Sequence, residues 1–129
     1  MDQNPEPATF PRDYRLTEAK QYQQVFAGSS RFGNRYITVL AKENQQEHPR
    51  LGMAISKKCA KRAVDRNRIK RVIRESFRVN CTTLPSVDMV VMCRPLILEL
   101  DNSTLFQQIE TQWSYIRKKM GSAQHSEAS

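Results

Sequence analysis

Cysteine is scarce in this 129-residue sequence, which holds three in all. Cys59, Cys81 and Cys93 are odd in number and far apart, and they show neither C-x-x-C spacing nor a neighbouring histidine cluster. Disulfide frameworks and zinc sites ordinarily show one of these signs. We therefore expect three reduced structural thiols and no metal site in the chain.

Long apolar runs and an export signal are also missing. No stretch approaches the ~18 consecutive apolar residues of a membrane span, and the N-terminal MDQNPEPATFP lacks the basic-then-apolar order of a secretory signal. A chain of 129 residues accommodates one ordinary domain with one hydrophobic core. The sequence therefore predicts a soluble, cytoplasmic, single-domain protein with no membrane partner.

The residue patterns of catalytic centres are absent too. The histidines His48 and His125 stand in a polar segment and in the C-terminal tail, and no H-x-E or paired-carboxylate motif occurs. The acids Asp65, Glu75 and Asp88 are scattered along the sequence, although scattered acids can still meet in a fold. We expect no catalytic residue in this chain and no small-molecule substrate.

Positive charge, by contrast, is plentiful and concentrated in KKCAKRAVDRNRIKRVIRESFR, residues 57–78. This segment holds ten Lys and Arg against two acids, so its net charge is 10 − 2 = +8. The chain has 21 bases and 13 acids, which leaves 11 of each outside the segment. Because all the net charge lies in one segment, a polyanion is the expected partner, most often a nucleic acid.

Apolar periodicity divides the chain into short elements. A helix that Thr17 can cap and Gly28 can end has its apolar residues three and four apart. Further elements are strands at 35–42 and 50–56, placed to pair as a hairpin, a helix in the basic segment, a strand at 88–94 and a helix at 103–120. This order predicts an α+β fold with helices packed on a small sheet. Residues 1–11 and 121–129 are predicted to be disordered tails, which leaves 12–120 as the domain.

The basic segment separates into two faces when it is drawn as a helix at about 100° per residue. The face expected to pack on the sheet carries Ile69, Val72, Ile73, Ser76 and Phe77. The opposite face carries Asn67, Arg71, Arg74 and Arg78, flanked by Arg68 and Lys70. Like charges four apart cost an isolated helix ~0.2–0.5 kcal/mol each, and cations near its start oppose the helix dipole. Phosphates would reverse both effects, so this face is predicted to bind an anionic partner.

Two aromatic residues suggest that the partner is single-stranded. Tyr22 and Phe26, four apart on the first helix, can stack on bases, and Gly52 and Ala54 belong to a small-residue face that a backbone could approach. The alternatives are that both aromatics are core residues and that the basic face only keeps the chain soluble. Solubilising surfaces usually mix both signs of charge, which this face does not.

The stretch RLGMAISKKCAKRAVDRNRIKRVIRESFR, residues 50–78, closely resembles the bacterial ribonuclease P protein component, whose hallmark is an Arg-Asn-Arg helix followed by Lys-Arg and Arg-Glu. The resemblance extends upstream through RLTEAKQYQQVFAGSSRFGNRYITVL and downstream through DMVVMCRP to the last helix. It implies the element order α-β-β-β-α-β-α on a mixed sheet, with one strand more than periodicity shows. It also implies a left-handed β-α-β crossover around the basic helix, against the usual right-handed rule.

The resemblance assigns the basic residues to RNA binding. The positions that match the helix the family applies to its catalytic RNA are Arg66, Asn67, Arg68, Lys70, Arg71 and Arg74, and the same face continues to Arg78. Lys57 and Lys58 match a lysine pair that meets phosphates. The CAKRAVD spacer is one residue longer than in some members, so Lys61 and Arg62 receive no role.

A second set of residues matches the family's cleft for the single-stranded 5′ leader of precursor transfer RNA. Tyr22 and Phe26 match two aromatic positions of that cleft, and Leu40 stands where some members place a Tyr. The resemblance implies that the catalytic RNA subunit and the leader are the partners. It implies that the RNA cleaves the leader with Mg²⁺ bound mainly by the RNA, and that the chain alone is non-catalytic. The alternative is a ribosomal or other structural RNA-binding protein, and a self-sufficient metal-dependent nuclease is a distant third.

Overall fold

The structure is a computed structural model that describes residues 12–121. Its elements are a 3₁₀ turn at Arg12–Tyr14, α1 at Ala19–Ala27, β1 at Ser30–Gly33, β2 at Ile37–Glu43, β3 at Arg50–Ala54, α2 at Ala63–Asn80, β4 at Val87–Cys93, a 3₁₀ turn at Pro95–Glu99, α3 at Asn102–Ile116 and a π turn at Arg117–Gly121. The α+β class and the order α-β-β-β-α-β-α are confirmed, and β1 is the strand that periodicity missed. The predicted tails at 1–11 and 121–129 lie outside the described residues, apart from Gly121.

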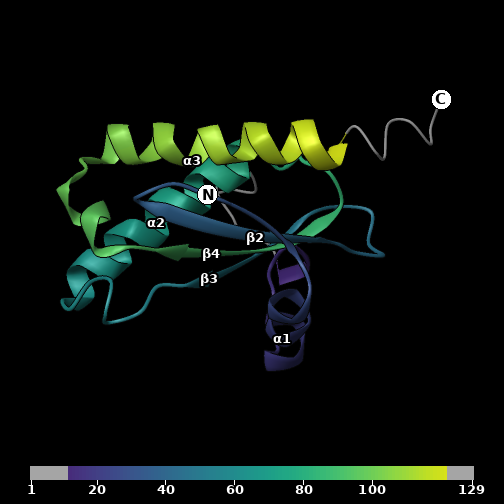
Figure 1. The fold of residues 1–129 in the computed structure, drawn as a ribbon, viewed down its shortest axis with the longest axis horizontal. Coiled ribbons are helices and arrows are strands. Elements are labelled where there is room, and N and C mark those ends of the chain that lie inside the picture. The colour runs from purple at the N-terminus through teal and green to yellow at the C-terminus, as the bar shows by residue number, and fades with distance from the viewer. Residues whose placement is uncertain (1–11, 122–129) are drawn as a thin grey trace, which may run out of the picture.

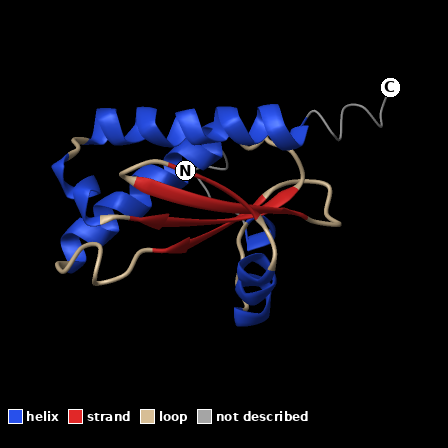
Figure 2. Cartoon of the chain, viewed as in Figure 1, coloured by secondary structure: helices blue, strands red, loops and turns tan. Residues whose placement is uncertain are grey.

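The four strands form one mixed sheet (Figure 2), and their order in it is β1-β2-β4-β3. β2 pairs antiparallel with β1 and β4, whereas β3 pairs parallel with β4. The expected hairpin of residues 35–42 with 50–56 is therefore wrong, because β4 lies between these two strands. Periodicity identifies a strand, but it carries no information about which distant strand pairs with it. α2 connects the parallel neighbours β3 and β4 in a left-handed crossover, as the resemblance implies.

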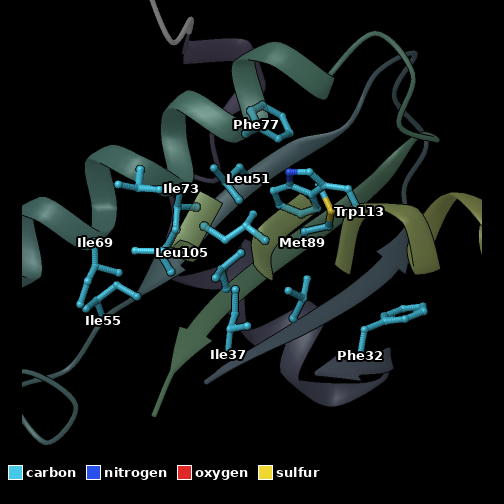
Figure 3. Packing of buried hydrophobic residues seen from close by; sticks show 14 of the residues in the cluster. Phe32, Ile37, Leu51, Ile55, Ile69, Ile73, Phe77, Met89, Leu105 and Trp113 are labelled. Atoms are coloured by element: carbon cyan, nitrogen blue, oxygen red, sulfur yellow. The ribbon is translucent and has the colours of Figure 1, made fainter. Parts of the chain in front are cut away.

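Helices cover the two faces of the sheet unequally (Figure 1). α2 and α3 pack on one face, where they bury the main core around Phe77, Met89 and Trp113 (Figure 3). The predicted inner face of the basic helix is confirmed, because all five of its residues are buried. One of them, Ser76, accepts a hydrogen bond from Trp113 Nε1 at 2.8 Å. Within residues 12–121, no helix is both long enough and apolar enough to cross a membrane.

α1 lies on the other face, over a small cluster of Leu16, Val25 and Val90. The helix begins one residue later than predicted, because Glu18 rather than Thr17 is its N-cap, in a capping box with Gln21. Within α1 only Val25 is buried. The predicted apolar stripe therefore packs through Val25 and, partly buried, through Tyr22, and the sheet residues Leu40, Ala54 and Met92 beside it stay half-buried.

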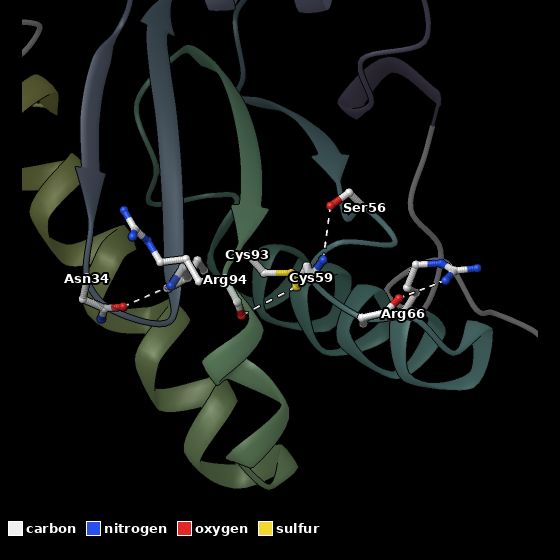
Figure 4. Close-up of a disulfide and its surroundings, with 8 residues drawn as sticks. Asn34, Ser56, Cys59, Arg66, Cys93 and Arg94 are labelled. Atoms are coloured by element: carbon white, nitrogen blue, oxygen red, sulfur yellow. Dashed lines mark hydrogen bonds between the residues drawn. A yellow bond between two sulfur atoms is a disulfide. The ribbon is translucent and has the colours of Figure 1, made fainter.

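The basic segment is not one continuous helix, because α2 begins only at Ala63. Its first four cations, Lys57, Lys58, Lys61 and Arg62, lie in the loop that follows β3. That loop is anchored by Cys59, which is buried and forms a disulfide with Cys93 at the end of β4 (Figure 4).

The expectation of three reduced thiols is therefore wrong. Parallel pairing sets Ala54 beside Met92, so the residues that follow them bring Cys59 and Cys93 together although they are 34 positions apart in sequence. Cys81 remains a free, half-buried cysteine. Sequence spacing alone could not show this proximity.

An ion pair joins the two parallel strands near the start of β3. Arg50 Nε and Nη2 donate to the two carboxylate oxygens of Asp88, each at 2.7 Å, and Asn44 Nδ2 donates to Asp88 Oδ1 at 2.9 Å. The hydrogen bonds to Asp88 raise the pKa of Arg50 above its ordinary value. Both side chains are largely buried, so removing one partner would leave the other charge uncompensated.

We expect Asp88→Ala to lower the free energy of unfolding by about 3 kcal/mol, because it leaves the Arg50 guanidinium without its carboxylate partner. Glu75→Ala is the matched control, since it breaks the exposed ion pair of Glu75 with Arg78 and should cost less than about 1 kcal/mol. Urea unfolding of both variants measures the difference. Equal losses would contradict a special role for the buried pair.

Candidate nucleic-acid interface

The outer face of α2 carries cations with no partner of their own. Lys70, Arg71 and Arg74 make no side-chain hydrogen bond or ion pair within residues 12–121. Arg71 and the neighbouring Asn67 are exposed, whereas Lys70 and Arg74, in the middle of α2, are half-buried. These cations repel one another, so an anionic ligand on this face would lower the electrostatic energy.

Three other predicted RNA-binding residues are engaged within the protein. Arg66 Nη1 donates to the carbonyls of Ala60 and Lys61 at 2.9 and 2.8 Å, which ties α2 to the preceding loop. Arg78 pairs with Glu75, and the hydrogen bond between them raises the pKa of Arg78. Arg66 and Arg78 can still face an anion, but each already has a structural partner.

The third engaged residue, Arg68, connects α2 to the start of α3. Its Nη1 donates to Asn102 Oδ1 at 2.7 Å. Beside it, Asp101 caps α3 by accepting from the Thr104 backbone N–H at 2.8 Å, and this bond, assisted by Arg68, lowers the pKa of Asp101. Arg68 therefore helps to fix the angle between the two helices.

A cleft of about 400 Å³ runs along the outer edge of β3, and we call it the β3-edge cleft. Its lining residues are Arg15, Leu16, Tyr22, Leu51, Gly52, Met53, Lys70 and Arg74. The segment before α1 reaches this edge because Leu16 N–H donates to the Leu51 carbonyl at 3.0 Å. The cleft thus joins one aromatic ring of α1 to two free cations of α2. Sequence reasoning missed Arg15, since nothing in the local pattern places it beside β3.

Tyr22 reaches the cleft because Gly52 has no side chain. A Cβ at position 52 would lie 2.8 Å from Cε2, Cζ and Oη of Tyr22, well inside van der Waals contact. The small-residue face was expected to admit a partner's backbone, but at Gly52 it admits a ring of the protein itself. Gly52 therefore positions Tyr22.

The other predicted leader-binding residues, Phe26 and Leu40, do not line the cleft. Phe26 is 51 % exposed on α1, so the alternative that it is a core residue is wrong. Leu40 is half-buried on β2 and packs against the small cluster under α1.

The predicted phosphate-binding pair Lys57 and Lys58 is exposed in the loop after β3.

The donor set of this interface does not fit a magnesium ion. Mg²⁺ prefers carboxylate, carbonyl and water oxygens, whereas the β3-edge cleft presents arginine and lysine side chains. Among residues 12–121, no three His, Cys, Asp or Glu side chains gather as a metal site would require. The side chains of this interface are suited to anions and not to a metal cation.

Comparison with known proteins gives the family. The sequence model of the family described as ribonuclease P matches residues 10–117. The chain belongs to the ribonuclease P family. Within that family it is 48 % identical over 105 residues to the ribonuclease P protein component of Thioalkalivibrio sulfidiphilus, an alignment that covers 81 % of this chain and 88 % of the relative. It is 46 % identical over 110 residues to that of Chromohalobacter salexigens, with 84 % and 86 % covered.

Solved structures of the ribonuclease P family share the fold. The RNase P protein of Staphylococcus aureus superimposes with a TM-score of 0.75 at 29 % identity, covering 79 % of this chain and 94 % of that one. The RNase P protein of Thermotoga maritima gives a TM-score of 0.72 at 29 % identity, with 79 % and 96 % covered. The family and the fold inferred from the sequence are therefore confirmed. Membership of this family implies that the chain is a subunit of a ribonuclease.

We expect Gly52→Ala to displace the Tyr22 ring while the fold survives, since the ring is the mobile end of a side chain. The unfolding free energy should fall by roughly 1 kcal/mol, and this loss should vanish in a Tyr22→Ala background. NMR detects the displacement as a lost contact between the Tyr22 ring protons and the residue 52 Hα.

The control for this substitution is Gly28→Ala, because a Cβ at Gly28 meets nothing within 4 Å. It should leave the Tyr22 signals unchanged. A Gly52→Ala protein with an unmoved Tyr22 ring would contradict the positioning role.

Proposed function

We propose that this chain is the protein subunit of the ribonuclease P ribonucleoprotein, which removes the 5′ leader from precursor transfer RNA. In this proposal the catalytic RNA subunit holds the Mg²⁺ ions and performs the endonucleolytic hydrolysis. The protein contributes binding: the outer face of α2 contacts the catalytic RNA, and the β3-edge cleft receives the single-stranded leader. The chain alone is non-catalytic.

One observation carries the proposal, namely that Tyr22 and the free cations Lys70 and Arg74 line the same cleft. A single strand presents phosphates along one side and unstacked bases along the other. Proteins that bind such strands combine a basic groove with aromatic stacking surfaces. The β3-edge cleft offers both within one hollow, which a simple basic patch would not.

We further propose that the subunit works in the cytoplasm, where precursor transfer RNA would be its substrate. Reducing conditions there usually keep cysteines as thiols. The strand ends would then hold Cys59 and Cys93 as neighbouring thiols, with the Lys57–Lys58 loop still anchored by buried Ile55 and Ala60.

A reconstitution assay tests the proposal. Precursor transfer RNA is incubated at low Mg²⁺ with the chain alone, with the catalytic RNA alone and with both. Strong release of the leader is expected only with both components. Cleavage by the chain alone would favour a self-sufficient nuclease, and no stimulation of the RNA would favour a structural RNA-binding protein.

The free cations of α2 should make binding to the catalytic RNA strongly dependent on salt. If about four to six phosphates are neutralised, the slope of log affinity against log salt should be roughly −3 to −5. Arg71→Ala with Arg74→Ala removes two contacts, so the slope should shrink by roughly 1.4 to 1.8. Lys118→Ala with Lys119→Ala, in the π turn Arg117–Gly121 after α3, removes the same charge elsewhere and should leave the slope nearly unchanged. If both double variants behave alike, α2 does not supply the specific contact.

Phe26 should contribute to leader binding by stacking, which depends little on salt. Because the ring is about half exposed, Phe26→Ala should leave folding stability almost intact. It should reduce the preference of the holoenzyme for precursor over mature transfer RNA by ~1–3 kcal/mol. The control is Tyr115→Ala on α3, since Tyr115 is 52 % exposed and equally aromatic. Equilibrium binding of both RNAs, with thermal melting of each variant, measures the effect; a preference that survives in Phe26→Ala would remove this residue from the leader path.

A further inference from the structure

A second cluster of cations without partners lies toward the β1 edge of the sheet, whereas the β3-edge cleft lies at the other edge. Arg31 of β1, Arg35 of the β1–β2 turn and Arg94 after β4 line a hollow of about 430 Å³ together with Gly33, Asn34 and Thr38, and we call it the arginine hollow. All three arginines are exposed. Within residues 12–121 their guanidinium groups form no hydrogen bond or ion pair, and no acid lines the hollow.

The arginine hollow is built on a rigid turn. Asn34 Oδ1 accepts from the backbone N–H groups of Tyr36 and Ile37 at 2.8 and 3.1 Å, and Asn34 Nδ2 donates to Gln108 Oε1 of α3 at 2.8 Å. Arg94 N–H donates to the Tyr36 carbonyl at 3.0 Å, which fixes the end of β4 against the same turn. Figure 4 shows Asn34 and Arg94 on these neighbouring chain segments. The backbone that carries the arginines is therefore set before any ligand binds, which lowers the entropic cost of binding.

The charges of the arginine hollow favour an anionic ligand. Its three guanidinium groups repel each other, and no acidic residue among those that line the hollow offsets their positive charge. Guanidinium is the side chain best suited to paired hydrogen bonds with phosphate oxygens. A phosphate backbone is thus the complementary ligand.

The strand register connects the arginine hollow to the β3-edge cleft. Gly33 pairs with Thr38, Thr38 with Met92 and Met92 with Ala54, so these four residues form one row across the sheet. The row points to the face that carries α1, because Met92 and Ala54 pack against the small cluster there and both stay half-buried. Three strand spacings of ~4.8 Å separate its ends, about 14 Å in all. One end of the row lies at the hollow, and the other lies beside Gly52 at the cleft.

We infer that the arginine hollow binds backbone phosphates of the 5′ leader, upstream of the nucleotides that stack at Tyr22. This inference rests on the proposed function, since it takes the leader to enter through the β3-edge cleft. In that function α2 faces the catalytic RNA, so the nucleotides nearest the cleavage point lie nearest α2. A longer leader then continues over the row from Ala54 to Gly33 and reaches the hollow last.

The length of the leader is the variable that tests this path. Precursor transfer RNAs whose leaders are shortened one nucleotide at a time are bound to holoenzyme with the wild-type chain or with Arg31→Gln and Arg35→Gln together. We expect roughly tenfold weaker binding of long-leader substrates by the variant and no change for leaders too short to reach the hollow. The salt slope should shrink by roughly 1.4 for long leaders only, since two single-strand contacts are lost. Arg94→Gln alone should show the same dependence on length.

Controls separate this inference from the proposed function. Lys118→Gln with Lys119→Gln removes two charges elsewhere and should weaken binding at no leader length, and thermal melting shows that each variant is folded. Equal weakening at every length would place the arginines against the transfer RNA body or the catalytic RNA, and no weakening would leave the hollow without a role; both results overturn the inference. If Phe26→Ala still reduces the preference for precursor in those cases, the proposed function stands without the hollow.

Discussion

The parallel pairing of β3 with β4 is the constraint on which the rest of the structure depends. It forces the chain to leave β3 at one end of the sheet and to return to β4 at the other, and α2 is the connection that does so. The largely buried pair of Arg50 with Asp88 joins the two strands at one end, and Cys59 with Cys93 joins them at the other. α2 is thereby fixed along the β3 edge, and its outer face meets the cleft there.

The cations of this protein divide into two kinds by what surrounds them. Arg50, Arg66 and Arg78 have carboxylate or carbonyl partners within the chain and support its architecture. Arg71 and Arg74 have none among the described residues, and neither do the three arginines of the hollow. The second kind costs electrostatic energy in the free protein, which an RNA backbone would recover. The arginines without a partner are thus the ones most available to an anion.

The unequal covering of the sheet leaves room on one face for the proposed path of the leader. α1 buries one of its own side chains, Val25, and leaves Phe26 exposed. In the row from Gly33 to Ala54, Thr38 is buried, whereas Gly33, Met92 and Ala54 are at least partly exposed. A larger helix contact would have stabilised the sheet but closed this face. Tyr22 lies tightly against Gly52, and this contact shapes the cleft.

The sequence by itself determined the family, the element order and the buried face of the basic helix, because these depend on local periodicity and on a long ordered match around Arg66–Glu75. Only the tertiary structure decided which distant segments meet. It places β4 between β2 and β3, joins Cys59 to Cys93, sets Tyr22 on Gly52 and brings Arg31 and Arg94 to one hollow. Each of these joins residues far apart in the chain. Local patterns record what a segment can form, whereas the register of long-range strand pairs decides which side chains meet, and that register is a property of the whole fold.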